Sequence, residues 1–535
     1  MILSTYAQAT SKVVAQILGR RHPTYDLMAD HWDFLMETYT GGREWFEKHI
    51  FKYMKEGETE FTDRVKRAYR FNHSREVVDL VNKYVFKGKV RRNEDDAPTE
   101  IREFWQKATR GGKDIDSYMR FISKRSSIVG RIWVVVDAVR RGEGESRKEA
   151  DAQVYSYSVL PQNVLDMSFD DDEQLNWILI REVTRDDEDP TSTTSRQYYR
   201  YRLWTRNTWH LFKEDNPERK TNQNIRFAFV EEGKHDLGVV PVFPVDHMES
   251  DELYHSPSMI GDVAYLDRTC ANYLSNLDAI IQDQTFSQLA IPAQGLLPGE
   301  DGHDKVIEAG TKRIFTYDAE GGAPFFLSPD PKQAELIITS IRQIINEIYV
   351  VVGVNGERTK QDNAQGIDNS SGVAKAYDFE RVNSLLVNKS KGLEAAEYQM
   401  MDLVMRYHGN KEFESPRNDS GRKTLVVWPT DFDTRGLHDE LDISARLEAL
   451  TTPIELKRYQ LKQVLDKLYP FISEKDRNEL TKSIDDMADD LTEQVGLAFG
   501  KPTPSVSSDA ADKQDKDSDT DTDQDTGQDK AKREA

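Results

Sequence analysis

The chain has 535 residues, too many for a single hydrophobic core, and at about 150 residues per domain we expect three or four structural units. Its single cysteine, Cys270, excludes a disulfide framework and a cysteine-rich zinc module. The net charge of -22 argues against a protein that grips DNA by neutralising phosphates, but not against one that surrounds DNA. We expect no membrane span and no secretory signal, because the apolar runs are too short.

Helical patterns dominate the first 130 residues. Residues 25–39 predict one helix, and the mostly helical spacing of apolar residues across residues 60–86 predicts further helical structure. Residues 114–130 predict a third helix, which a buried strand at residues 132–136 follows.

From there to about Pro244 the helical spacing is replaced by aromatic and β-branched runs that alternate with polar turns. Such runs predict the strands of an antiparallel sheet. The predicted strands cover residues 154–159, 177–183, 197–204, 209–212, 226–231 and 239–245.

A long helical stripe begins at Ser258, where apolar residues recur every three or four positions as far as Ile281. Cys270 lies within this stripe, so a packed thiol is favoured over a nucleophile. Proline and glycine residues then break the chain, and residues 312–317 and 324–327 predict a short hairpin.

A second apolar stripe begins at Pro331 and predicts a helix over residues 331–352. Its isoleucines share one face, and polar residues occupy the opposite face. A polar loop, residues 353–372, separates this helix from a third long helix predicted over residues 373–408.

The remainder of the chain is predicted to be a strand at residues 424–428 followed by shorter helices. These helices cover residues 437–450, 453–468 and 473–499. From Lys501 onward there is scarcely an apolar side chain, so we expect this acidic tail to be disordered.

Motifs of the common nucleotide-binding and hydrolytic enzymes are absent, including the P-loop and G-x-S-x-G. One cluster contains residue types that bind divalent ions: His247, Glu249, Asp251, Glu252 and His255. A solvated loop is the favoured interpretation, because no pair in it has a recognised ligand spacing. The cluster nevertheless defines one alternative hypothesis, a metal-dependent nucleic-acid-processing enzyme.

The order of the elements is unusual: a helical stripe, a small β insert, a second stripe, a long polar loop and a third long helix. This order resembles the portal proteins of tailed double-stranded DNA bacteriophages. Short segments between Tyr39 and Phe86 are also similar to the opening of that family, and residues 371–380 resemble the start of its helix after the tunnel loop. The resemblance covers roughly residues 25–500.

The resemblance implies a mixed α+β, mainly helical subunit with a wing, a helical stem, a small α/β clip, a tunnel loop and a helical crown. The implied boundaries are 1–257 for the N-terminal part of the wing, 258–286 and 331–352 for the stem helices, 287–330 for the clip, 353–372 for the tunnel loop, 373–435 for the long helix and wing return, and 436–500 for the crown. The acidic tail, residues 501–535, falls outside it.

The resemblance also implies a function. Family members are non-enzymatic rings, usually of twelve subunits, through which double-stranded DNA passes without sequence specificity during packaging and ejection. The implied partners are the terminase large subunit, a head-completion or adaptor protein, and the major capsid or scaffolding protein. The implied location is the portal vertex of the virion, after synthesis in the host cytoplasm. A further alternative is a capsid scaffolding or adaptor protein, which the length fits less well.

Three groups of residues follow as candidate sites, and no catalytic residue, metal or cofactor is expected. The tunnel-loop residues that would line a DNA channel are Asn355, Arg358, Lys360, Asn363 and Gln365. The polar stem face would add Glu335, Arg342 and Asn346. Subunit packing in the stem is assigned to Leu266, Leu274, Ile337, Ile341 and Ile344.

Overall fold

The computed structural model describes residues 11–139, 153–185, 191, 197–214, 227–285, 288–292, 314–317, 325–327, 331–353, 372–417, 421–430, 432, 454–469, 476–477 and 479–486. The chain divides into two compact units, Met1–Thr434 and Arg435–Ala535, and each is described by itself. In the part of the chain so described, no helix combines the length and apolar character that crossing a bilayer requires.

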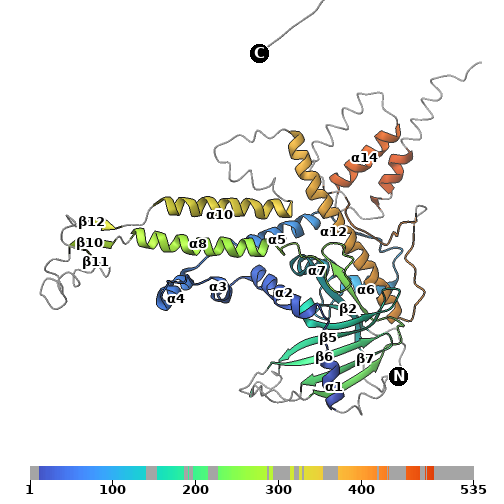
Figure 1. The fold of residues 1–535 in the computed structure, drawn as a ribbon. Coiled ribbons are helices and arrows are strands. Elements are labelled where there is room, and N and C mark those ends of the chain that lie inside the picture. Colours follow the sequence, from blue (N-terminus) through green and yellow to red (C-terminus); the bar gives the residue numbers. More distant parts are fainter. Residues whose placement is uncertain are drawn as a thin grey trace, which may run out of the picture. The chain divides into compact units, whose positions relative to one another are not determined.

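Seven helices precede β2 (Arg131–Val139) in the described residues 11–130. They are α1 (Ser11–Leu18), α2 (Tyr25–Thr40), α3 (Arg43–His49), α4 (Glu58–Arg67), α5 (His73–Val85), α6 (Thr99–Gln106) and α7 (Ile115–Val129). Two of them, α3 and α4, lie beside α8 (Val263–Thr285) rather than beside the sheets (Figure 1). The helical prediction for residues 60–86 is confirmed, but as two helices, because the chain leaves helical geometry at Ala68. It restarts at Asn72, whose side chain accepts a hydrogen bond from the Arg75 amide and so caps α5.

The predicted helix over residues 114–130 is confirmed as α7. Asp114 caps its first turn by accepting a hydrogen bond from the Ser117 amide. Gly130 ends the helix with φ 86°, a conformation that favours glycine. A Cβ atom at Gly130 would lie 1.9 Å from the Ser256 carbonyl oxygen, so a larger residue cannot be accommodated without moving backbone.

The predicted β-rich section is confirmed, and it forms two antiparallel sheets. The first has the order β3-β2-β9 and contains β2 (Arg131–Val139), β3 (Gln153–Val159) and β9 (Val242–Asp246). The second has the order β4-β5-β6-β7-β8, with β4 (Val164–Phe169), β5 (Leu175–Arg185), β6 (Gln197–Thr205), β7 (Thr208–Glu214) and β8 (Phe227–Lys234). A two-stranded pair joins β1 (Arg91–Arg92) to β13 (Val426–Val427).

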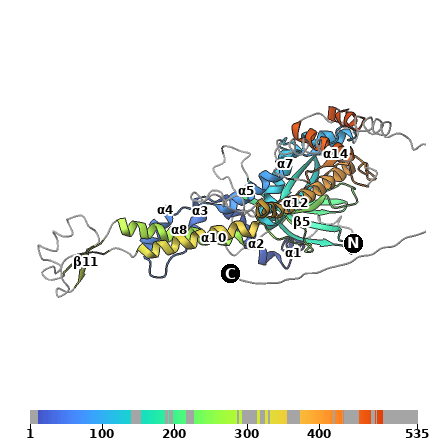
Figure 2. The same cartoon turned by 90° about the horizontal axis from the view of Figure 1, so that it is seen from above.

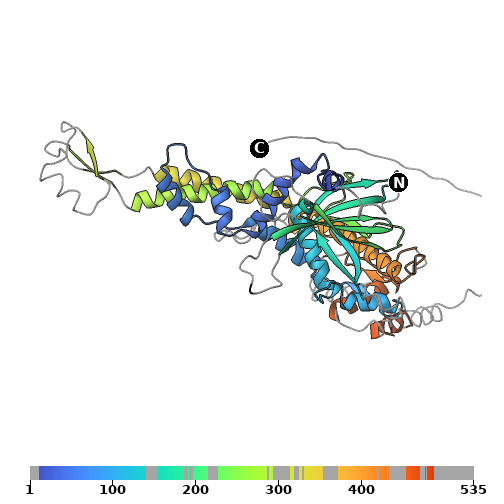
Figure 3. The same cartoon turned by 90° about the horizontal axis from the view of Figure 1, so that it is seen from below.

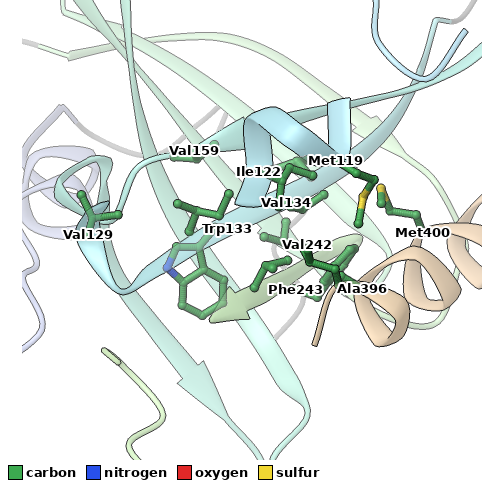
Figure 4. Close-up of a cluster of buried hydrophobic side chains, with 14 of the residues drawn as sticks. Met119, Ile122, Val129, Trp133, Val134, Val159, Val242, Phe243, Ala396 and Met400 are labelled. Carbon is green, nitrogen blue, oxygen red and sulfur yellow. The ribbon is translucent and has the colours of Figure 1, made fainter. Parts of the chain in front are cut away.

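The main core lies where α7 and the long helix α12 (Gly372–Tyr407) meet the three-stranded sheet. Figure 4 shows Met119 and Ile122 of α7, Val134 of β2, and Met400 of α12 close together. All four side chains are completely buried. Because the apolar residues of α7 and α12 recur at helical spacing, each helix presents one apolar face to the sheet.

Two long helices, α8 (Val263–Thr285) and α10 (Pro331–Val352), lie side by side and extend away from the sheets (Figures 1, 2 and 3). α10 has the predicted bounds, whereas α8 begins five residues after the predicted start, Ser258. A three-stranded sheet follows α8 in the chain, and its strands are β10 (Gln288–Pro292), β11 (Ile314–Tyr317) and β12 (Phe325–Leu327). The predicted hairpin of the last two is wrong, because β10 lies between them, parallel to β11 and antiparallel to β12.

The third long helix is confirmed as α12, one residue earlier at each end than predicted. In the second unit, α14 (Ile454–Leu468) agrees with its predicted range, and its Lys462 forms an ion pair of 2.7 Å with Asp485. The predicted helix at 437–450, most of that at 473–499 and the acidic tail lie outside the described residues. The described chain therefore has a mixed α and β fold.

Candidate functional site: the helices α8 and α10 and their supports

The contact between α8 and α10 is apolar. Cys270, Leu274 and Ile341 are almost completely buried in it. This burial confirms the packed thiol predicted for Cys270. The five residues assigned to subunit packing, Leu266, Leu274, Ile337, Ile341 and Ile344, all belong to apolar clusters within one chain. Their contact with other subunits therefore stays a prediction.

The surface of α10 that does not face α8 divides into two stripes, because residues three and four apart share a helix face. One stripe carries Glu335, Arg342 and Asn346, all of which are exposed. We call it the channel stripe, after the role predicted for these residues. Among the described residues, neither Glu335 nor Arg342 has an ion-pair partner. The outer stripe carries Leu336, Ser340, Gln343, Glu347 and Val351.

The predicted channel residues of the tunnel loop, Asn355, Arg358, Lys360, Asn363 and Gln365, lie outside the described residues. The helix that precedes them is firmly anchored at its end. The Tyr349 hydroxyl donates a 2.6 Å hydrogen bond to Glu76 Oε2 of α5 and lies 3.3 Å from His73 Nδ1. Tyr349 itself is buried. The end of α10 next to the predicted loop is therefore fixed on α5.

α8 is held to α4 by a buried arginine that the sequence analysis did not single out. Arg64 of α4 donates two hydrogen bonds of 2.7 Å to the Glu56 carboxylate. It also donates to Ser275 Oγ of α8 at 2.9 Å and to the Phe51 carbonyl at 2.8 Å. Because these acceptors neutralise and hydrogen-bond the buried guanidinium, the charge is satisfied and fixes α4 on α8.

A second buried ion pair ties α8 to α5. The carboxylate of Asp267 in α8 lies 3.3 Å from Arg70 Nη1 and accepts a 2.8 Å hydrogen bond from the Ser74 hydroxyl of α5. The Arg70 guanidinium lies 3.8 Å from the centroid of the Trp45 ring, a cation–π arrangement. The base of α8 is thus attached to the N-terminal helices by charges that water cannot reach.

Lys389 of α12 is a third buried charge-bearing group, but its partners are neutral. Its Nζ lies 3.1 Å from His247 Nδ1 and 3.3 Å from Ser126 Oγ of α7. Burial lowers the pKa of Lys389 to about 7. Burial, and then the nearby Lys389 amine, lower the pKa of His247 well below its ordinary value. This cluster joins α12, α7 and the residue after β9.

The cluster of acidic residues and histidines at 247–255 is not assembled as a metal site. The His247 imidazole is buried against the Lys389 amine, whereas Glu249, Asp251 and Glu252 are exposed. Within the described ranges, no group of three or more His, Cys, Asp or Glu residues could hold a metal ion. The structure therefore gives no support to the alternative of a metal-dependent enzyme.

Comparisons with known proteins give a matching family model, and the solved structures that match include two particle necks. The family model described as "Phage portal protein, SPP1 Gp6-like" matches residues 25–512. No curated protein sequence matches the chain. A chain of the "Neck of empty GTA particle computed with C6 symmetry" is 12% identical with a TM-score of 0.37, covering 72% of this chain and 89% of that one. A chain of the "Neck of native GTA particle computed with C12 symmetry" is also 12% identical, with a TM-score of 0.38, and the match covers 84% of this chain and 98% of that one. We base no conclusion on TM-scores this low.

Proposed function

The chain belongs to the SPP1 Gp6-like family of phage portal proteins, and from that membership we propose that it forms a ring at one capsid vertex through which double-stranded DNA passes. The observation that carries the proposal is the extent of the family match, residues 25–512, which includes α8, α10 and α12. The family is structural rather than enzymatic. We therefore assign the chain no reaction and expect a separate ATPase to supply the work of packaging.

The pair formed by α8 and α10 supports this proposal as the stem of the subunit. A rod of two helices with a buried apolar seam has enough surface left to contact neighbouring copies and a channel. The channel stripe, Glu335, Arg342 and Asn346, would repeat around the ring once per subunit. Each of its charges would then form a ring of like charges around the DNA.

The charge of the chain supports passage of DNA rather than firm binding. With the twelve subunits usual in the family, a charge of -22 per chain gives about -264 for the ring. Such an assembly repels phosphates, so its contacts with DNA are weak and screened by salt. Weak contacts suit DNA that must slide in both directions, because tight phosphate pairing would act as a brake.

The remaining parts of the subunit are proposed to contact the partners of the ring and the passing DNA. The clip, residues 287–330, would receive the terminase large subunit during packaging and a head-completion or adaptor protein afterwards. The wing would contact the major capsid or scaffolding protein. The tunnel loop, residues 353–372, would touch the passing DNA through Arg358, Lys360 and its amide side chains. The assembled ring would be part of the virion at its portal vertex, made in the host cytoplasm.

Electron microscopy of the purified chain tests the proposal directly. Negative-stain images are expected to show annular particles with a central hole, and light scattering after size-exclusion chromatography is expected to give the mass of a closed oligomer. A chain that stays monomeric at all concentrations, and also in the presence of scaffolding or capsid protein, would contradict the proposal.

A further inference from the structure

Arg268 of α8 is an arginine held in place by aromatic rings. Its guanidinium carbon lies 4.9 Å from the centroid of Phe34, 5.0 Å from that of Tyr265 and 5.4 Å from that of Phe51. Arginine stacks well on aromatic faces and keeps its N–H donors in one plane. The three rings therefore present the guanidinium in a fixed orientation.

Within the described part of the chain, this guanidinium has no partner that accepts its hydrogen bonds. Among the residues that the structure describes, none forms a hydrogen bond or ion pair with the Arg268 side chain. Arg268 lines a pocket of about 320 Å³ together with Phe51, Lys52, Tyr53, Thr269, Asn272 and Asn276. The Asn272 amide is already used, because it binds the His49 carbonyl and the Phe51 amide. The pocket therefore offers a bidentate cation that matches a carboxylate.

The rim of this pocket is suited to a protein surface rather than to a dissolved ion. Phe51 and Tyr53 of the pocket are 57% and 63% exposed, and Met54, the next residue along the chain, is 87% exposed. Exposed aromatic residues, methionine and arginine are the residue types enriched where proteins contact one another. The occupant should therefore bring a carboxylate together with apolar side chains.

The outer stripe of α10 has this composition. Glu347 is exposed and, within the described part of the chain, has no ion-pair partner. On the same stripe, Leu336 is 69% exposed and Val351 is 50% exposed. Of the three faces of α10, one packs on α8 and one is the proposed channel stripe. The outer stripe is the face that remains for a neighbour.

The two surfaces lie on opposite sides of α8. Cys270 faces α10, and Arg268 precedes it by two residues, which is about 200° around the helix. Figure 1 likewise shows α10 on one side of α8 and α3 and α4 on the other. One chain therefore cannot bring Glu347 to its own Arg268. A ring, in contrast, joins two different surfaces of successive subunits.

Arg268 and Glu347 also lie in the same part of the helix pair. Leu274 and Ile341 pack together further from the sheets, whereas Val263 and Ile348 belong to the main core at the base. Arg268 falls between Val263 and Leu274, and Glu347 falls next to Ile348. In a ring whose axis runs along the stem, residues at a common height meet across the subunit interface.

We propose that Arg268 of each subunit binds the carboxylate of Glu347 from the next subunit, with Phe51 and Tyr53 packing against Val351 beside the ion pair. This inference rests on the proposed function, because it needs a ring. To the proposed ring, the inference adds the identity of the two surfaces through which neighbouring subunits contact each other. Removing or reversing one partner of such a buried arginine–carboxylate pair is costly, because the other charge is then left buried and unpaired.

Charge reversal tests the proposal. R268E and E347R are each expected to lower the fraction of chain assembled into rings by about tenfold or more at a fixed concentration, because like charges then face each other. The double variant R268E/E347R restores the attraction, so its ring fraction should return to near the wild-type value. Light scattering measures the ring fraction, and circular dichroism confirms that each variant is folded. R268Q, which removes the charge without reversing it, provides a milder variant if R268E does not fold.

The matched control combines R268E with E335R. Glu335 lies on the channel stripe, so its reversal should leave the R268E defect in place. Single variants that assemble as well as wild type, a double variant that does not recover, or equal recovery by R268E/E335R would each overturn the pairing while leaving the ring intact. Failure of the wild-type chain to form rings would instead overturn the proposed function.

Discussion

An Ile341→Asp variant is expected to lose the contact between α8 and α10 and, with it, ring assembly. Ile341 is 6% exposed and packs with Cys270 and Leu274 in the seam between the helices. Placing a carboxylate there leaves a charge among apolar side chains, and we expect a loss of about 3 kcal/mol or more in the free energy of unfolding. Thermal unfolding followed by circular dichroism measures this loss, and light scattering measures the ring fraction.

The control for this variant is Arg342→Asp. It introduces the same carboxylate one residue further along α10, on the exposed channel stripe. We expect its thermal midpoint to stay close to that of the wild-type chain, because a charged residue on an exposed helix face is already solvated. An Ile341→Asp chain with an unchanged midpoint and intact rings would show that the two helices do not pack through this face.

A Lys389→Met variant is expected to be more stable than the wild-type chain at neutral pH. The folded chain lowers the pKa of this amine from 10.5 to about 7. Between those pH values the unfolded chain binds a proton that the folded chain does not, so the wild-type free energy of unfolding should rise with pH. Methionine fills a similar volume and removes the free-energy cost of burying the lysine amine. The expected gain is about 3 kcal/mol at pH 7, and it should shrink toward pH 10.

Urea unfolding at a single protein concentration, at pH 7 and at pH 9.5, measures the effect. Lys391→Met is the matched control, because Lys391 lies two residues along the same helix and is exposed. It should leave both the stability at pH 7 and the pH dependence unchanged. A Lys389→Met chain that is less stable than wild type at pH 7 would show instead that the amine is charged and satisfied in the fold.

Periodicity alone predicted the elements whose stabilisation is apolar. The stripe from Pro331 to Val352 gave the bounds of α10 and the face that carries Ile341, because one long helix with one buried face leaves a clear 3.6-residue pattern. Most strands of the two antiparallel sheets were predicted from their aromatic and β-branched runs, whereas β4 (Val164–Phe169) was missed. The order β11-β10-β12 was not predictable, because strand partners far apart in the chain leave no local signal.

The buried charges at the base of α8 were missed because each one depends on a distant partner. The sequence around Asp267 predicts a solvated side chain next to an apolar stripe. In the structure its carboxylate instead contacts Arg70 and Ser74, almost 200 residues away in the chain. Lys389 likewise interrupts a helical apolar pattern. In both cases, a charged residue on an otherwise apolar helix face was the sequence signal that could have predicted a buried charge. The break between α4 and α5 was missed because the apolar spacing continues through it, whereas the cap at Asn72 ends and restarts the helix.

The antiparallel course of α8 and α10 makes the segment between them a replaceable cassette. The chain leaves the end of α8 at Thr285 and returns to the adjacent end of α10 at Pro331 (Figure 1). Evolution can therefore lengthen, shorten or exchange this cassette without disturbing either helix, since both attachment points stay where they are. Chimeras joined at Thr285 and Pro331 would exchange this segment while keeping both helices.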